Sequence, residues 1–218
     1  MTDKKKTKFD NIKLLLLGDT NVGKTSIFER FIKGKFAENK SASIGIDFET
    51  NILKYKNTNY TIDLYDIPGQ ERFRSIVPSY YRIVEGFFIV FDLTNENSLN
   101  SIQYWVDSIK EHLQEPKFII LGNKDDLKDK KISDEIINNE LNKLQQSENN
   151  KDLIYLKTSA KKDKNIKKAF EIMIDLLVNE NIPENEQKQQ LKANNTIKLD
   201  KRRHTKSEKE INRDKCGC

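Results

Sequence analysis

A glycine-rich segment, residues 18–25, lies directly behind the apolar run at residues 12–17 and ahead of a helical pattern. It reads G-x-x-x-x-G-K-T, a spacing in which the glycines let the backbone turn its N–H groups inward onto an anion. Lys24 can then place a positive charge beside terminal phosphates, and the Thr25 hydroxyl can reach Mg²⁺. The helix expected to begin at Thr25 points its positive end at the same anion. The segment therefore predicts a site for a nucleoside triphosphate.

Apolar runs and helical patterns alternate along the chain. Near-continuous apolar runs predict buried strands, at residues 12–17, 87–91, 118–121 and 153–157. A hairpin is expected from strands at 48–55 and 60–66 around the polar turn 56–59. Helical spacing of apolar residues predicts helices, at residues 25–33, at 99–113, behind a capping Ser133 and at 166–177, with a polar loop at 145–152. This order predicts an α/β fold: a six-stranded, mostly parallel sheet with one antiparallel strand and helices on both faces.

The net charge of +5 is distributed unevenly along the 218 residues. From Pro183 to the C-terminus there are ten Lys or Arg and six Asp or Glu residues. The rest of the chain, residues 1–182, therefore has an excess of only one positive charge. A nearly neutral body argues against a nucleic-acid partner, since such a domain carries a basic face. We expect a basic extension at residues 1–8 and one globular domain at 9–180. Because apolar residues are few after it, we expect a disordered tail at 181–218. No apolar signal region follows the first residues, so we do not expect secretion.

The chain contains two cysteines, Cys216 and Cys218, both at its C-terminal end. The body therefore has no disulfide framework and no cysteine-based zinc site. Lys215 excludes a C-a-a-X signal, but two lipid chains on these thiols would anchor a protein stably where one would not. Unmodified thiols in a solvated tail are the first alternative, and a metal-chelating pair is the second. His112 and His204 accompany no nucleophile and are interpreted as surface residues.

A second motif, Asp66-Ile67-Pro68-Gly69 followed by Gln70, ends the second strand of the expected hairpin. An aspartate in this place can hold Mg²⁺ through water, and the glycine N–H can turn onto a γ-phosphate. Gln70 can orient an attacking water. Arg72 and Arg74 follow closely, and we interpret them as solvated or partner-facing rather than as an arginine finger. The motif points to hydrolysis of the terminal phosphate.

Two further motifs are suited to binding the base of the nucleotide. Residues 123–126 read Asn-Lys-Asp-Asp after a buried strand, and residues 158–161 read Thr-Ser-Ala-Lys after another. The Asp126 carboxylate can accept both the N1–H and the exocyclic amine of guanine, a pair that adenine lacks. Small residues at 158–160 let backbone N–H groups reach a base carbonyl. Guanine is therefore the predicted base, and a P-loop kinase or ATPase is the less favoured alternative.

With four motifs in this order, residues 9–180 resemble the Ras-like small GTPases. Four shorter segments are similar to the Rab family in particular: IGIDF at residues 44–48, ERFRSI at 71–76, SYYR at 79–82 and the terminal CGC. The resemblance implies a P-loop GTPase fold, GTP or GDP with Mg²⁺ as cofactors, and slow hydrolysis of GTP to GDP and phosphate. It also implies double geranylgeranylation of Cys216 and Cys218.

The resemblance assigns residues to each role. Nucleotide-binding residues are Thr20, Asn21, Val22, Gly23, Lys24, Thr25, Ser26, Phe36, Ser43, Gly69, Asn123, Lys124, Asp126, Ser159, Ala160 and Lys161. Thr25, Ser43 and Asp66 would hold Mg²⁺, and Gln70 would be catalytic. Effectors would read Ile44, Gly45, Ile46, Asp47, Phe48, Tyr65 and Tyr80.

Partners and location follow from the same resemblance. It implies a monomer that meets an exchange factor, a GTPase-activating protein, effectors, a GDP-dissociation inhibitor and a prenylation escort protein. Its place would be the cytoplasmic face of an endomembrane compartment, with a cytosolic pool, in vesicle trafficking. Nothing in the sequence indicates which compartment.

Three residues depart from the family pattern. Ser43 stands where the family has Thr and keeps the hydroxyl, and Tyr65 replaces the usual Trp. Pro68 replaces the usual Ala, which removes an N–H and restricts the backbone just before Gly69. One interpretation is that Pro68 slows hydrolysis, which would make the protein a GTP-bound binding module with little turnover. The other is that proline simply suits a turn before glycine.

Overall fold

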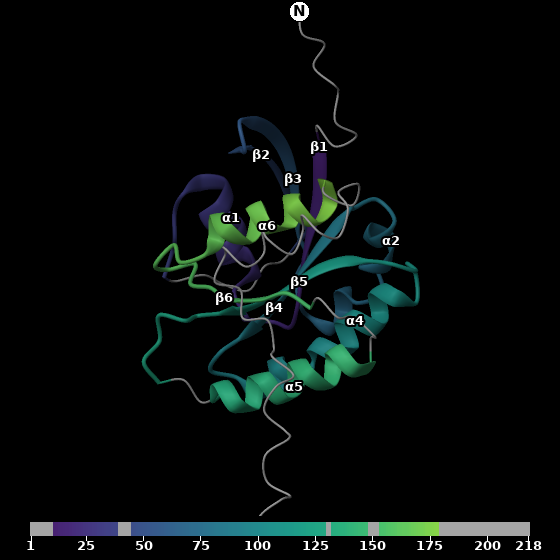
Figure 1. Cartoon of the computed structure of the whole chain (residues 1–218), viewed down its shortest axis with the longest axis vertical. Coiled ribbons are helices and arrows are strands. Elements are labelled where there is room, and N and C mark those ends of the chain that lie inside the picture. The colour runs from purple at the N-terminus through teal and green to yellow at the C-terminus, as the bar shows by residue number, and fades with distance from the viewer. Residues whose placement is uncertain (1–10, 39–44, 130–131, 148–152, 179–218) are drawn as a thin grey trace, which may run out of the picture.

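The computed structural model describes residues 11–38, 45–129, 132–147 and 153–178 (Figure 1). Its sheet has six strands in the order β2-β3-β1-β4-β5-β6. The strands are β1 (Asn11–Leu17), β2 (Asp47–Tyr55), β3 (Thr58–Asp66), β4 (Gly86–Asp92), β5 (Lys117–Asn123) and β6 (Tyr155–Lys157). Only the β2–β3 pair is antiparallel among these strands. The predicted fold is therefore confirmed.

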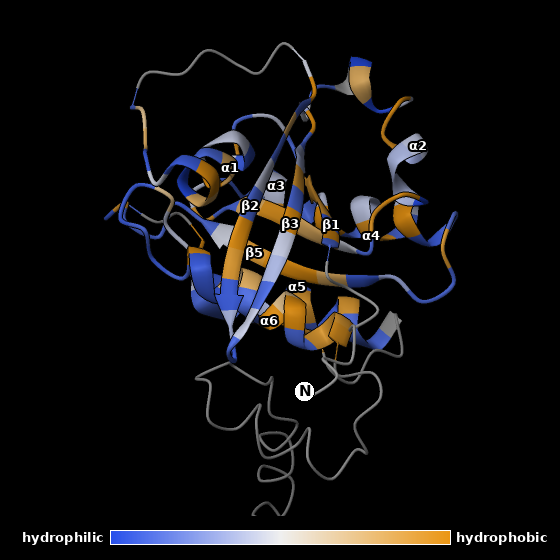
Figure 2. Cartoon of the chain, turned by 90° about the horizontal axis from the view of Figure 1, so that it is seen from above, coloured by the Kyte–Doolittle hydropathy of each residue, from blue (hydrophilic) through white to orange (hydrophobic). Residues whose placement is uncertain are grey.

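Helices cover both faces of the sheet. They are α1 (Lys24–Lys33), α2 (Pro78–Tyr81), α3 (Glu96–Asn100), α4 (Ile102–Lys110), α5 (Asp134–Ser147) and α6 (Ile166–Val178), with a 3-10 turn at Glu71–Phe73. In Figure 1, α1 and α6 lie on one side of the strands, and α4 and α5 lie on the other. Figure 2 shows the hydrophobic strands between these layers. None of the helices described is long and apolar enough to cross a bilayer.

Residues 87–91 of strand β4 form an unbroken apolar run because helices cover both faces of the strand. Phe88 packs edge-on against Phe170 of α6, with ring centroids 4.8 Å apart. Its neighbour Phe87 faces the opposite layer, where its ring lies 5.7 Å from that of Tyr81. Alternate side chains point to opposite faces of a strand, so a strand between two helical layers needs apolar residues at every position.

Several predicted boundaries are wrong. The hairpin turn is tighter than expected, because Lys56 and Asn57 both take positive φ values of 45° and 64° and β3 begins at Thr58. The helix predicted over 99–113 is two helices that meet at Ser101. The first starts early because the Asn95 side chain caps it by accepting the Asn97 N–H.

The C-terminal half departs from prediction in smaller ways. Helix α5 continues through Ser147, where a loop from residue 145 was expected, while Ser133 caps it as predicted, its hydroxyl accepting the Ile136 N–H at 3.3 Å. Strand β6 is shorter than the predicted 153–157. His112 is half-buried rather than solvated, because its ring packs against Tyr81. Pro183 and His204 lie outside the described residues.

Candidate nucleotide-binding site

A pocket of about 570 Å³ opens at the edge of the sheet where the parallel strands end. It is lined by Thr20, Asn21, Gly23, Lys24, Thr25, Ser26, Phe36, Ala37, Glu38, Pro68, Gly69, Gln70, Asn123, Lys124, Asp126, Leu127, Ala160 and Lys161. All four predicted motifs contribute to this set. Ligands of open α/β sheets bind in such crevices, and the volume suits a small organic ligand.

The glycine-rich loop contains left-handed backbone conformations that few residue types adopt easily. Gly23 has φ +97°, and a Cβ added to it would lie 2.3 Å from Nδ2 of Asn123. Asn21 also takes a positive φ of 65°, which asparagine tolerates better than most residues. The Gly23 carbonyl accepts the Ile27 N–H at 3.0 Å, so α1 begins directly from the loop with its N-terminus at the pocket. This arrangement suits an anion.

Lys24 is the buried cation of the pocket, with 6% of the residue exposed. Its ammonium donates to the Gly18 carbonyl at 2.9 Å and to the Asp19 carbonyl at 2.8 Å. Burial lowers the pKa of Lys24 to about 8, against the opposing effect of the Asp66 and Asp19 carboxylates. The amine is therefore still largely protonated near neutral pH, and a phosphate beside it would favour the charged form.

This pKa predicts a pH dependence of nucleotide binding. Phosphate anions raise the pKa of Lys24 in the complex above about 8, so the affinity is full below that pH and falls as the pH rises toward the bound-state value. We expect GDP binding to weaken by up to about tenfold per pH unit above about pH 8, measured by calorimetry at constant Mg²⁺. The slope should be absent in Lys24→Met. An affinity that is constant to about pH 9 would contradict the role of Lys24.

Two of the three predicted metal ligands, Thr25 and Asp66, are in contact with each other. The Thr25 hydroxyl donates to Oδ2 of Asp66 at 2.5 Å, and Asp66 is 1% exposed. A hydroxyl that donates to a carboxylate keeps its lone pairs for a cation, and hard oxygen donors fit Mg²⁺. Asp66 does not line the pocket itself, which agrees with a contact through water. Ser43, the third predicted ligand, lies outside the described residues.

Residues 68–70 pack against the glycine-rich loop. A Cβ on Gly69 would come within 2.4 Å of the Asp19 carbonyl carbon and within 2.5 Å of the Asp19 and Gly18 oxygens. Gly69 and Gln70 both line the pocket, and so does the buried Pro68. Only glycine allows this approach of two backbones.

Polar side chains in and behind the pocket wall join the two base motifs to each other and to the glycine-rich loop. Asn123 donates from Nδ2 to the Val22 carbonyl at 3.0 Å and accepts the Ala160 N–H on Oδ1 at 3.3 Å. Ser159 donates to Oδ1 of Asp126 at 2.6 Å. The side chains of Val22 and Ser159, two of the predicted nucleotide-binding residues, lie behind the lining, with exposures of 1% and 0%, so a nucleotide would meet their backbone rather than their side chains.

Some lining residues were missed by sequence reasoning. Glu38 pairs with Lys161 at 2.6 Å across the pocket rim, and Ala37 lies beside it. Leu127 places a 42% exposed apolar side chain next to Asp126. The sequence signal for Ala37, Glu38 and Leu127 as lining residues was their position directly after the predicted site residues Phe36 and Asp126. An ion pair also joins the side chain of Asp125, in the first base motif, to Lys164, three residues after the second.

The predicted effector residues form a partly exposed aromatic patch. Phe48 is 49% exposed, and its ring lies 4.8 Å from that of Tyr65, which in turn lies 5.7 Å from Tyr80. Gly45, Ile46 and Asp47 lead into this patch, and Ile44 lies outside the described residues. Arg74 stacks over the rings of Tyr104 and Trp105, at 4.6 Å and 5.8 Å, and so does not point into the pocket.

Comparison with known proteins agrees with this geometry. A sequence model of the Ras family matches residues 13–179. Ras-related protein Rab-8B of Dictyostelium discoideum is 36% identical over 160 residues, covering 73% of this chain and 76% of its own. GTP-binding protein ypt1 of Schizosaccharomyces pombe is 34% identical over 72% of this chain and 75% of its own. Human Ras-related protein Rab-27A is 34% identical over 77% and 78% respectively.

The chain therefore belongs to the Ras family of small GTPases and is Rab-like within it. It is a GTPase of the class that acts in vesicle trafficking. Proteins of this class bind GTP or GDP with Mg²⁺, meet regulators and effectors, and associate with endomembranes.

Proposed function

We propose that the protein cycles between a GTP-bound active state and a GDP-bound inactive state and recruits effectors to an endomembrane surface while GTP is bound. The observation that carries the proposal is the single pocket in which Lys24, Gln70 and Asp126 meet. These residues match a terminal phosphate, an attacking water and a guanine base respectively.

The chemistry in this proposal depends mainly on charge and positioning. Lys24 and the N-terminus of α1 stabilise the negative charge that spreads over the phosphate oxygens. Gln70 orients the water, and Thr25, Asp66 and Ser43 would hold Mg²⁺, which would supply positive charge against the phosphates. Among the described residues, the pocket lining contains no arginine. An activating partner that brings one is expected to raise the rate by about 10³–10⁵.

Nucleotide analysis of the purified full chain tests the proposal. We expect co-purified GDP or GTP, and competition in which unlabelled GDP displaces labelled GDP while ADP does not. Displacement by ADP would instead support the kinase or ATPase alternative. Failure of folded protein to bind either guanine nucleotide in the presence of Mg²⁺ would refute the proposal.

We also propose a membrane anchor on the tail at residues 181–218, with residues 1–8 as a basic extension and 9–180 as the GTPase domain. Cys216 and Cys218 would each carry a geranylgeranyl chain, which requires an escort protein, and a GDP-dissociation inhibitor would maintain a cytosolic pool. Two chains suffice for stable anchoring. Both cysteines lie outside the described residues. Mass spectrometry of protein from its native cell should find the two modifications, and free thiols there would remove the anchor.

A GTP-bound scaffold with low hydrolysis is a second candidate, favoured by Pro68 next to Gly69 in the pocket wall. Proline holds its φ near −65° and restricts Ile67 before it. If this slows the movement of Gly69 and Gln70, Pro68→Ala is expected to accelerate single-turnover GTP hydrolysis by more than about threefold. A rate within about twofold of the parent would exclude this effect of Pro68.

A further inference from the structure

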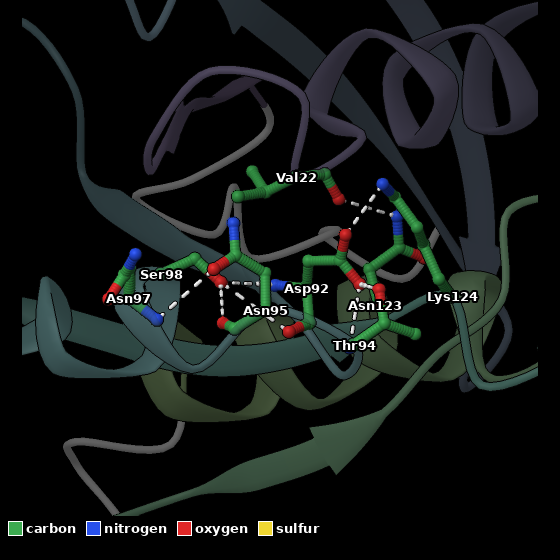
Figure 3. Close-up of polar contacts among 8 residues, drawn as sticks. All are labelled: Val22, Asp92, Thr94, Asn95, Asn97, Ser98, Asn123 and Lys124. Carbon is green, nitrogen blue, oxygen red and sulfur yellow. Dashed lines mark hydrogen bonds and ion pairs between the residues drawn. The ribbon is translucent and has the colours of Figure 1, made fainter. Parts of the chain in front are cut away.

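Asp92 is a buried carboxylate at the end of β4 to which the sequence assigned no role. The residue is 6% exposed, and its Oδ2 lies 2.7 Å from the ammonium of Lys124. Figure 3 shows the Lys124 side chain reaching this carboxylate. Lys124 lines the pocket, whereas Asp92 does not. The ion pair therefore connects a pocket residue to the interior of the protein.

Neighbouring groups hold the Asp92 carboxylate and backbone in place. Its Oδ1 accepts both the N–H and the hydroxyl of Thr94, each at 2.8 Å. Its own N–H donates to the Ser98 hydroxyl at 3.0 Å, which donates in turn to the Asn95 carbonyl at 2.7 Å. Asn95 is also the residue that caps α3 (Figure 3). The carboxylate is thus oriented by the start of a helix, independently of any ligand.

The backbone of Lys124 is held as firmly. Lys124 takes a left-handed φ of 66°, which is uncommon for a residue other than glycine. Its carbonyl accepts the Leu127 N–H at 3.1 Å, and the next residue, Asp125, donates its N–H to the Thr158 carbonyl at 3.0 Å. The backbone and the ammonium of Lys124 are therefore both held, and its flexible stem between them is ordered before any nucleotide binds.

We propose that Asp92 is a positioning residue for the guanine base, acting through Lys124. By binding the ammonium behind the wall, it keeps the stem of Lys124 against the pocket and keeps the charge away from the phosphates. Without Asp92, the ammonium is drawn to solvent, to which the Lys124 side chain is already 32% exposed, and the stem leaves the wall. This inference rests on the proposed binding of a guanine nucleotide.

Asp92→Asn is the sharpest variant, because it removes the charge but keeps the volume and an oxygen for Thr94. We expect GDP and GTP each to dissociate about tenfold faster from the full chain, by the same factor, since the base is common to both. Single-turnover hydrolysis of bound GTP should stay within about twofold of the parent, because the phosphate end is untouched. The release of radiolabelled GDP or GTP into excess unlabelled nucleotide measures the two dissociation rates.

A double-mutant cycle separates positioning from structural damage. Lys124→Met keeps the stem and removes the ammonium, so adding Asp92→Asn to it should change dissociation by less than about twofold. Asp175→Asn is the matched control, since it neutralises the aspartate of another Lys–Asp ion pair, with Lys56, outside the pocket lining, and it should leave dissociation unchanged. An unchanged rate in Asp92→Asn alone would overturn the inference. Equal acceleration in both backgrounds would also overturn it, because Asp92 would then act independently of Lys124. If the parent binds no guanine nucleotide, the proposed function fails first.

Discussion

Lys24→Met is expected to weaken GTP binding by at least about a hundredfold, because it would remove the charge-assisted hydrogen bonds that we propose Lys24 makes to the terminal phosphates. Lys24 is the buried cation of the pocket, and its ammonium points to the loop carbonyls of Gly18 and Asp19. Calorimetry with GTP and GDP at fixed Mg²⁺ and salt measures the loss. GTP should lose more than GDP, since the predicted contact is with the terminal phosphates.

Stability distinguishes this effect from misfolding. Burial lowers the pKa of Lys24 from 10.5 to about 8, so the folded state disfavours the charged form of its amine. The contribution of Lys24 to the free energy of unfolding therefore rises with pH between the folded-state pKa of about 8 and the unfolded-state pKa of 10.5. Methionine removes that penalty together with the two hydrogen bonds to the loop carbonyls, so the nucleotide-free variant should still fold, which a cooperative melting transition would show. Lys33→Met, on the exposed end of the same helix, is the control and should bind normally. Normal GTP binding by Lys24→Met would remove the basis for the phosphate site.

Gly69→Ala is expected to slow single-turnover hydrolysis of bound GTP by about a hundredfold, the effect of displacing reacting groups by about 1 Å. The added methyl would meet backbone atoms of Asp19 and Gly18 at 2.4–2.5 Å, and backbone cannot yield as a side-chain tip would. The segment that carries Gln70 must therefore move away from the glycine-rich loop. GDP binding should change by less than about fivefold, because the base end of the pocket is remote from Gly69.

Gly45→Ala provides the matched control for this substitution. A Cβ at Gly45 meets no atom of the described residues within 4 Å, and no positive φ is required there. Its hydrolysis rate should therefore equal that of the parent. Equal rates in Gly69→Ala and Gly45→Ala would show that the close contact at Gly69 has no part in hydrolysis. A large loss of GDP binding in Gly69→Ala would indicate general damage to the loop.

The predictable part of the site came from local chemistry. The glycine at position 23 is required by a φ of +97° that other residues avoid, and Lys24 follows it at the start of a helix. Motifs after β1, β3, β5 and β6 were therefore recognisable one by one. Their convergence was also predictable, because parallel strands end at one edge. The helix break at Ser101 was not, since a capping side chain at Asn95 competes with the apolar period.

The sequence alone determined the α/β order, the motifs and the chemistry of the ligand they suit, because backbone conformations, strand burial and helix starts depend on near neighbours in the chain. Only the tertiary structure decided which of these residues line the pocket and which lie behind its wall. Val22 and Ser159 turned out to lie behind the lining, and Asp92 and Lys124, more than thirty residues apart, proved to be an ion pair. Such distinctions depend on side-chain directions across strands distant in sequence, which no local pattern encodes.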